Sequence, residues 1–226
     1  MWIIILMVQS AQFQQAQSEL IALAADLPED PDVLLQVGGM FLQAGDPARA
    51  LEEFRQVSRL EPRNAAALAG AGQAAFQQAN YPLARRYLQR AVTLNPADTR
   101  SAQLLQTSDL VLQLDPYLPR IGNAERARRV LQALEHAGNR LEDCARKLNI
   151  DLTRQPPTNP IAVDNADLEA LNERASRRVL ARDADLVDAA MDMVFRSEAD
   201  ATVACGQPQG ADLALSLIAR VNGGRQ

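Results

Sequence analysis

Apolar and small residues in the first part of the chain recur at an interval of 34 residues. Within each interval they lie three and four residues apart, which is the spacing of one face of an α-helix. The recurring positions are Pro28, Pro62 and Pro96; Ala16, Ala50 and Ala84; Leu20, Phe54 and Leu88; Leu60 and Leu94; and Gly38 and Gly72. Such a period predicts a stack of helical hairpins in which a proline ends each second helix.

The residue types within the repeat fit two closely packed helices. Gly38 and Gly72 lack side chains and leave room for a neighbouring helix, while bulky residues of the second helix fill the contact. Gly45-Asp46 and Asn80-Tyr81 supply the turn between the two helices of each unit.

The pattern continues over residues 97–114, which predict the first helix of a third unit. Residues 115–119 then contain two prolines, which cannot both lie inside one helix. Beyond them an unbroken apolar stripe runs from about Asn123 to Asn149. We therefore expect one long helix there, in which Gly138 costs about 1 kcal/mol.

The last third of the chain has a different composition. Residues 151–163 are rich in proline and predict a linker. Three helices are expected after it, over residues 167–181, 184–204 and 210–221, followed by a frayed tail at 223–226. Asp183 is the expected N-cap of the second of these helices, and Gly206 its end. No stretch alternates with a period of two, so no sheet is expected.

The predicted fold class is therefore all-α. It consists of an α-solenoid with a long last helix over residues 11–150 and an additional helical region over residues 164–226.

Each repeat resembles the tetratricopeptide repeat family at eight signature positions. In the first full unit these are Leu34, Val37, Gly38, Phe41, Ala50, Phe54, Val57 and Pro62. In the second they are Leu68, Ala71, Gly72, Ala75, Ala84, Leu88, Ala91 and Pro96. Ala75 departs from the family's usual aromatic residue, and Phe76 next to it can take its place. The resemblance implies an α-solenoid that binds other proteins or peptides.

The resemblance also implies a concave binding groove, which is lined by the first helix of each unit. The positions expected to line it are Asp32, Leu35, Gln36, Gly39, Ala66, Ala69, Gly70, Gln73, Arg100, Gln103, Leu104 and Thr107. Some members of the family hold a carboxylate with lysines and asparagines at such positions, and this chain lacks that clamp. Its small and apolar residues suit a helix or an extended segment, either from a partner or from the chain's own terminal helices.

The chain begins with an apolar segment, WIIILMV, over residues 2–8. It is too short to cross a bilayer, which takes about 20 residues. Two interpretations stay open for residues 1–10. The segment is either a truncated anchor or export signal, which would associate with a membrane, or the first helix of an incomplete repeat that residues 11–28 complete.

Composition narrows the class of partner. The net charge of −5 argues against nucleic acid, because phosphates would be repelled. Among the 23 basic residues only Lys147 is a lysine, which is typical of a GC-rich bacterial genome.

Two cysteines, Cys144 and Cys205, are the sharpest chemical feature outside the repeats. They are either two reduced thiols in a cytoplasmic protein or a disulfide in an exported one. Closing so long a loop would stabilise the fold by about 4 kcal/mol. The segment from Cys205 to Arg220 resembles the C-terminal end of bacterial envelope proteins that carry these repeats, which favours the disulfide.

Catalytic chemistry has little support in the sequence. His136 lies off the apolar stripe and is expected on the surface, and neither cysteine has CxxC spacing. No nucleophile elbow, zinc-protease motif or phosphate-binding loop is present. Asp183, Asp185, Asp188 and Asp192 complement a helix dipole. We expect no enzyme, cofactor or metal site.

These observations favour a scaffold or adaptor in a complex of the bacterial envelope or periplasm, with a homodimer through exposed apolar faces of the terminal helices. The alternatives are a cytoplasmic adaptor with reduced cysteines and, less favoured, an enzyme with an active site that carries no motif.

Overall fold

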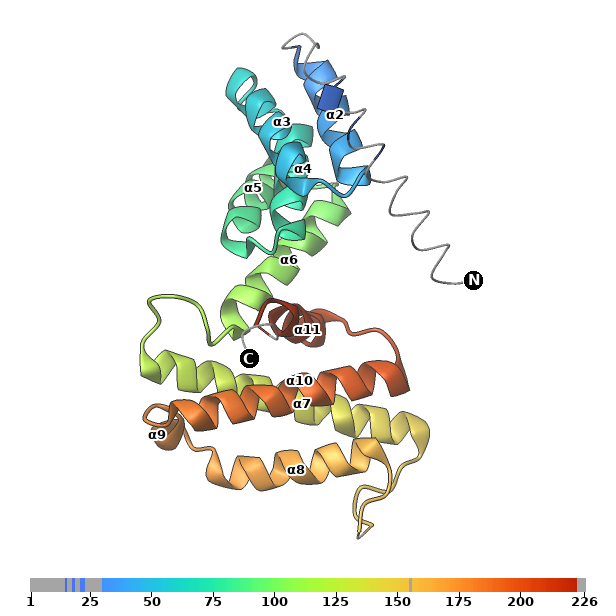
Figure 1. Ribbon diagram of the computed structural model, residues 1–226, viewed down its shortest axis with the longest axis vertical. Helices are drawn as coiled ribbons and strands as arrows, with labels where there is room; N and C mark the ends of the chain where they lie inside the picture. Colours follow the sequence, from blue (N-terminus) through green and yellow to red (C-terminus); the bar gives the residue numbers. More distant parts are fainter. Residues whose placement is uncertain (1–14, 16–17, 19–20, 23–29, 155, 223–226) are drawn as a thin grey trace. The chain divides into compact units, whose positions relative to one another are not determined.

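The computed structural model describes residues 15, 18, 21, 22, 30–154 and 156–222, and these residues form helices and turns without any strand. The predicted all-α fold class is confirmed (Figure 1). The apolar segment predicted at residues 1–10 lies outside the described residues, as does most of the half-repeat predicted at 11–28.

The chain divides between Ser108 and Asp109 into two compact units. The first contains α2 (Pro31–Gln43), α3 (Pro47–Leu60), α4 (Ala65–Gln77), α5 (Tyr81–Leu94) and most of α6 (Thr99–Leu114). The second contains α7 (Asn123–Leu148), α8 (Pro160–Arg174), α9 (Arg177–Leu180), α10 (Ala184–Cys205) and α11 (Gly210–Asn222).

Short polar side chains begin the helices of the first unit. Asp46 accepts a hydrogen bond from the backbone N–H of Arg49 at 3.0 Å, and Asn64 accepts one from Ala67 at 3.0 Å. Because these oxygens satisfy backbone donors that have no partner within the helix, they fix where α3 and α4 start. Pro47, the first residue of α3, already has the backbone angle that a helix needs.

Phe54 of α3 forms the centre of the first repeat. A Cβ atom placed on Gly38 of α2 would lie 2.8 Å from its ring, and one placed on Gly70 of α4 would lie 2.5 Å from it. The ring therefore occupies the space that two glycines leave open. In the second repeat Leu88 occupies the corresponding space at Gly72, where a Cβ would lie 2.5 Å away. The predicted close approach at Gly38 and Gly72 is confirmed.

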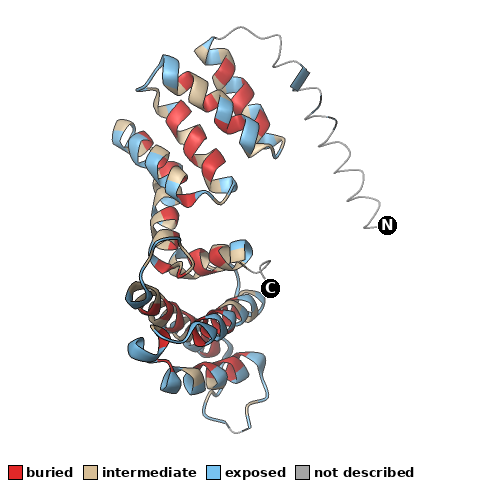
Figure 2. Cartoon of the chain, turned by 60° about the vertical axis from the view of Figure 1, so that its left-hand side comes forward, coloured by how far each residue is buried: buried red, intermediate tan, exposed pale blue. Residues whose placement is uncertain are grey.

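Helix α6 is the predicted first helix of a third repeat. Leu104 and Leu105 of α6 pack against Ala75, Ala84 and Leu88 of the second repeat. As in the other repeats, the buried residues gather where neighbouring helices meet (Figure 2).

The long helix was predicted correctly but its packing partners were not. α7 is one continuous helix, and a Cβ on Gly138 would meet Leu168 of α8 at an ordinary 3.5 Å. We expected α7 to close the array that ends near residue 150. Instead it packs against α8, α9, α10 and α11 within the second unit, because its apolar stripe is buried against those helices.

Helix α8 begins inside the predicted linker. Pro160 is its first residue, and the side chain of Asn159 accepts a hydrogen bond from the backbone N–H of Ile161 at 3.0 Å. An Asn-Pro pair therefore starts a helix here instead of extending a loop. The single helix predicted over residues 167–181 is replaced by α8 and the short α9. The predictions for α10 hold, with Asp183 as its N-cap and Gly206 as its end.

No helix formed by the described residues is long and apolar enough to cross a membrane.

Candidate protein-binding site

The predicted groove positions lie on α2, α4 and α6, and none of them is buried. Gln36, Ala66, Arg100 and Gln103 are exposed, together with Asp32. The partly exposed ones are Leu35, Gly39, Ala69, Gly70, Gln73, Leu104 and Thr107. Because α2 packs against α4, the residues that these two helices contribute can form one surface.

Three of the predicted positions also serve the fold. Gly70 has no room for a side chain because the Phe54 ring lies against it. Leu35 packs against the cluster of Leu34, Val57 and Ala67. The hydroxyl of Thr107 donates to the backbone carbonyl of Gln103 at 3.0 Å. These three residues present apolar or backbone surface, whereas the glutamines keep accessible amides.

The electrostatic character of this surface is close to neutral. One position of the repeat is occupied in turn by Asp32, Ala66 and Arg100. The single negative charge and the single positive charge offset each other. The other polar side chains are the amides of Gln36, Gln73 and Gln103 and the hydroxyl of Thr107, which already donates a hydrogen bond within α6. Amides donate and accept hydrogen bonds without charge, which suits the backbone of an extended peptide.

A pocket that the sequence reasoning missed lies where α5 meets the loop before α4. It has a volume of about 300 Å³ and is lined by Pro62, Arg63, Gln89, Arg90, Thr93 and Leu94. The guanidinium of Arg90 donates to the carbonyl oxygen of Pro62 at 2.9 Å. The 34-residue period could have indicated this pocket. Leu60 and Leu94 are equivalent positions of successive repeats, and each lines a pocket in its own repeat.

Comparison with protein families agrees with the geometry. The family model described as the tetratricopeptide repeat matches residues 6–52 and 40–99. This part of the chain belongs to the tetratricopeptide repeat family. A search of curated proteins found no match to it.

The match places the α2–α5 hairpins within the tetratricopeptide repeats, and it ends at the first residue of α6. Repeats of this family are protein-binding modules, so binding another protein is the activity that the family supports. The match does not reach the second unit, whose residues are therefore described from the structure alone.

The second unit contains a partly buried ionic cluster. Arg140 of α7 is 13% exposed, and its Nε lies 3.1 Å from Oε2 of Glu198 in α10. Its Nη1 lies 3.2 Å from the carboxylate of Asp212 in α11, and its Nη2 donates to the Gly206 carbonyl at 2.9 Å. One guanidinium therefore connects three helices.

The cluster contains two carboxyl groups and only one cationic side chain. The pKa of Glu198 is raised to about 8. Burial is the main cause and the nearby charge of Asp212 adds to it, while Arg140 acts in the opposite direction. Burial also raises the pKa of Asp212, again against the effect of Arg140. A single guanidinium cannot compensate two desolvated carboxylates, so a proton stays on Glu198 at neutral pH. The sequence reasoning missed this cluster because its members are far apart in the chain.

The two cysteines also meet in this unit. Cys144 of α7 and Cys205 at the end of α10 are paired, with their Cα atoms 5.7 Å apart. Both line a polar pocket of about 260 Å³, to which Arg140, Lys147 and Asp212 contribute.

The histidine and the aspartates that were considered for catalysis lie on the surface or take part in local hydrogen bonds. His136 is partly exposed, and Asp183 caps α10 through a hydrogen bond from the Leu186 N–H at 2.9 Å. Asp188 accepts a hydrogen bond from the hydroxyl of Tyr117 at 3.2 Å, and burial raises the pKa of that tyrosine. Within the described residues, no three His, Cys, Asp or Glu side chains are grouped as metal ligands would be.

Proposed function

We propose that this protein is a scaffold or adaptor that holds a neutral, extended segment of another protein against α2, α4 and α6. The observation that carries the proposal is the face these helices present, which combines small side chains with uncharged amides. Gly39, Ala66 and Ala69 allow a peptide backbone to come close. Gln36, Gln73 and Gln103 can then hydrogen-bond to it without a charge on either side.

The charge distribution argues against a strongly charged ligand. Asp32 and Arg100 lie at equivalent positions of different repeats, so neither negative nor positive charge dominates the face. A partner whose binding segment carries few charges fits this surface better than a terminal carboxylate or an acidic motif.

The envelope of a bacterial cell is the proposed location. The pairing of Cys144 with Cys205 supports it, because disulfides persist in oxidising compartments. The apolar residues 2–8 support it as well, as part of an export or anchoring segment. Reduced cysteines would favour the alternative of a cytoplasmic adaptor with the same binding face.

A homodimer through the terminal helices also belongs to this proposal. Val203 of α10 is 89% exposed, and Val221 of α11 is 43% exposed. Contact with a second copy would remove this apolar surface from water.

Site-specific photocrosslinking tests the binding face. A photoreactive amino acid at Gln36 or Gln103 should form a covalent adduct with a partner in the native host. The matched control places the same amino acid at Arg86 or Gln89, exposed residues of α5 outside the face. Adducts of the same mass and yield from both sets would contradict the assignment.

A count of free thiols tests the location. The protein is alkylated during lysis, denatured and then assayed for remaining and alkylated thiols. An intramolecular disulfide predicts that neither cysteine is alkylated before reduction and that both are alkylated after it. Alkylation of both cysteines before reduction would support the cytoplasmic alternative.

A further inference from the structure

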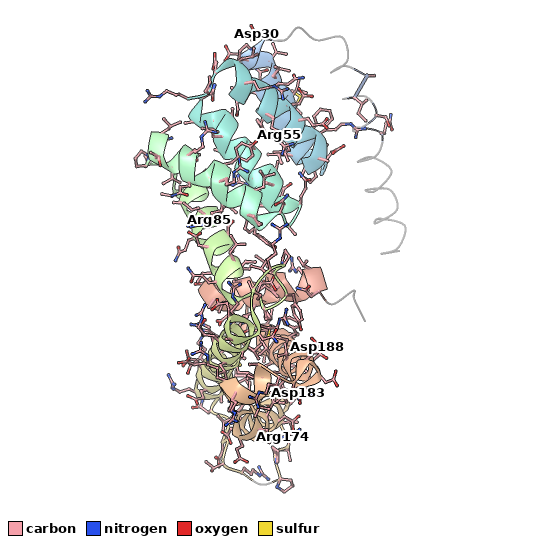
Figure 3. All side chains as sticks on the ribbon, turned by 90° about the vertical axis from the view of Figure 1, so that its left-hand side faces the viewer. Asp30, Arg55, Arg85, Arg174, Asp183 and Asp188 are labelled. Atoms are coloured by element: carbon pink, nitrogen blue, oxygen red, sulfur yellow. A yellow bond between two sulfur atoms is a disulfide. The ribbon has the colours of Figure 1, made fainter. Side chains whose placement is uncertain are left out.

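An unpaired cluster of arginines lies at one end of the second unit. Residues 174–182 contain Arg174, Arg177, Arg178 and Arg182 and no acidic residue. All four side chains are exposed, and none of them has an ion pair or hydrogen bond within the described part of the chain. Arg174 is labelled in Figure 3. In a protein with a net charge of −5, this segment is a local exception.

The backbone that carries these arginines is held in place. Ala175 and Leu180 are buried, with exposures of 5% and 2%. The hydroxyl of Ser176 caps α9 by accepting a hydrogen bond from the Val179 N–H at 3.4 Å. Because α9 also packs against α7 and α10, the arginines project from a fixed turn.

The nearest acidic residues in the sequence do not neutralise the cluster. Asp183 is occupied in capping α10, where its carboxylate accepts the hydrogen bond from Leu186. Glu173 is exposed and forms no ion pair with the arginines. The four guanidinium groups therefore keep their full hydrogen-bonding capacity for an external anion.

We propose that the segment 174–182 is a contact surface for an anionic phospholipid membrane. Val179 lies between the arginines in the sequence and is 42% exposed. Its exposure favours a lipid surface over a nucleic acid as the partner. Arginines around an apolar side chain suit a lipid interface, where guanidinium groups meet phosphates and the apolar group enters the headgroup layer. A nucleic acid backbone offers the phosphates but no apolar layer for the valine.

This surface is separate from the tetratricopeptide repeats and adds a second kind of partner to the protein bound there. The proposal does not depend on the groove, because no residue of α2, α4 or α6 takes part in it.

Flotation of the full chain with lipid vesicles tests the proposal. One set of vesicles is phosphatidylcholine alone, and in the other about a third of the lipid is phosphatidylglycerol. We expect binding to the anionic vesicles that weakens at high salt. Each arginine near an anionic surface raises partitioning by a factor of about five, so the variant R174Q/R177Q/R178Q/R182Q should bind more than tenfold more weakly.

The matched control is R59Q/R63Q/R86Q/R220Q, which removes the same charge from four exposed arginines elsewhere that also lack ion pairs. It should float like the wild type. Equal losses in both variants, or no dependence on lipid charge, would overturn the proposal, and so would tighter binding to duplex DNA than to the anionic vesicles. If both variants still bind to vesicles of phosphatidylcholine alone, that binding would be attributed to the apolar residues 2–8 and not to the arginines. The photocrosslinking result at Gln36 and Gln103 is independent of all these outcomes.

Discussion

Arg140 and Cys144 lie one helical turn apart on α7, and both hold the C-terminal end of α10. Arg140 donates to the carbonyl oxygen of Gly206 at 2.9 Å, and Cys144 is paired with Cys205, the last residue of α10. The first attachment is a hydrogen bond from a guanidinium group, and the second is a pair of cysteines, which a disulfide would make dependent on oxidation. Each can therefore be removed without altering the chemistry of the other.

Removing the disulfide should destabilise the second unit. Closing the loop between cysteines 61 residues apart is worth about 4 kcal/mol in the chain-entropy model. The variants C144A, C205A and C144A/C205A should lose this amount in the free energy of unfolding, measured by urea denaturation without reductant.

The control is the same measurement with reductant. Reductant should destabilise the wild type to the level of the double variant and leave the double variant unchanged. If reductant has no effect on the wild type while the variants are still destabilised, the loss comes from packing around the buried Cys144 and not from a disulfide.

Stability should also depend on pH through Glu198. Its pKa is raised from 4.5 to about 8 in the folded protein, so the folded state holds this proton more tightly than the unfolded chain does. The stabilisation is complete below pH 4.5 and is lost as the pH rises through that window to about 8. Each pH unit within the window removes up to about 1.4 kcal/mol.

The variant E198Q tests this directly, because a neutral amide replaces the protonated carboxyl. Relative to the wild type, it should gain stability as the pH is raised from 5 to about 8, as measured by thermal unfolding at each pH. The matched control is E173Q, which replaces an exposed carboxylate of α8 outside the cluster, so the change of profile should be specific to E198Q. A wild-type profile parallel to that of E198Q would show that Glu198 titrates normally.

The sequence predicted those features whose signals are local or periodic. The 34-residue interval identified Gly38 and Gly72 as close contacts, and the apolar stripe identified α7 as one helix across Gly138. Neither signal states which surface a helix packs against. The stripe of α7 fits a hairpin of the array as well as it fits α8 and α10, so its partners were assigned wrongly.

The groove and the ionic cluster illustrate the same limit. The groove positions could be proposed because they repeat with the units, but the contact of Gly70 with Phe54 depends on how two units stack. Arg140, Glu198 and Asp212 carry no shared spacing, and only the packing of α7, α10 and α11 brings them together. The start of α8 was missed for a different reason, since Pro160 was read as a helix breaker instead of a first residue.

Glycine to alanine substitutions on the groove face should have opposite effects at two positions. A Cβ at Gly70 would lie 2.5 Å from the Phe54 ring, so G70A should cost about 2 kcal/mol through overpacking. A Cβ at Gly39 would have no atom within 4 Å, so G39A should stabilise α2 by about 1 kcal/mol. Chemical denaturation of both variants measures the difference.

A second substitution checks the cause at Gly70. If the ring is the obstacle, F54L should cost less in the G70A background than in the wild type, because the smaller side chain relieves the clash. Additive losses would indicate that the backbone of α4, and not the ring, resists the new methyl group.

The turn between α4 and α5 offers a stabilising substitution. Ala79 has a φ of 55°, a left-handed conformation that is costly for a residue with a Cβ. Gly45 occupies the equivalent place in the first repeat, with a φ of 71°. A79G should therefore stabilise the protein by about 0.5 kcal/mol, since relief of strain is partly offset by the greater freedom of glycine in the unfolded chain.

The reciprocal variant G45A is the matched control for this turn. A Cβ at Gly45 would meet no atom within 4 Å, so only backbone conformation can make G45A unfavourable. We expect it to lower the free energy of unfolding by about 1 kcal/mol. If A79G and G45A both destabilise, the methyl group of Ala79 contributes packing that outweighs its strain, and the two turns are not equivalent. Opposite signs would show that the repeat tolerates alanine at position 79 at a conformational cost.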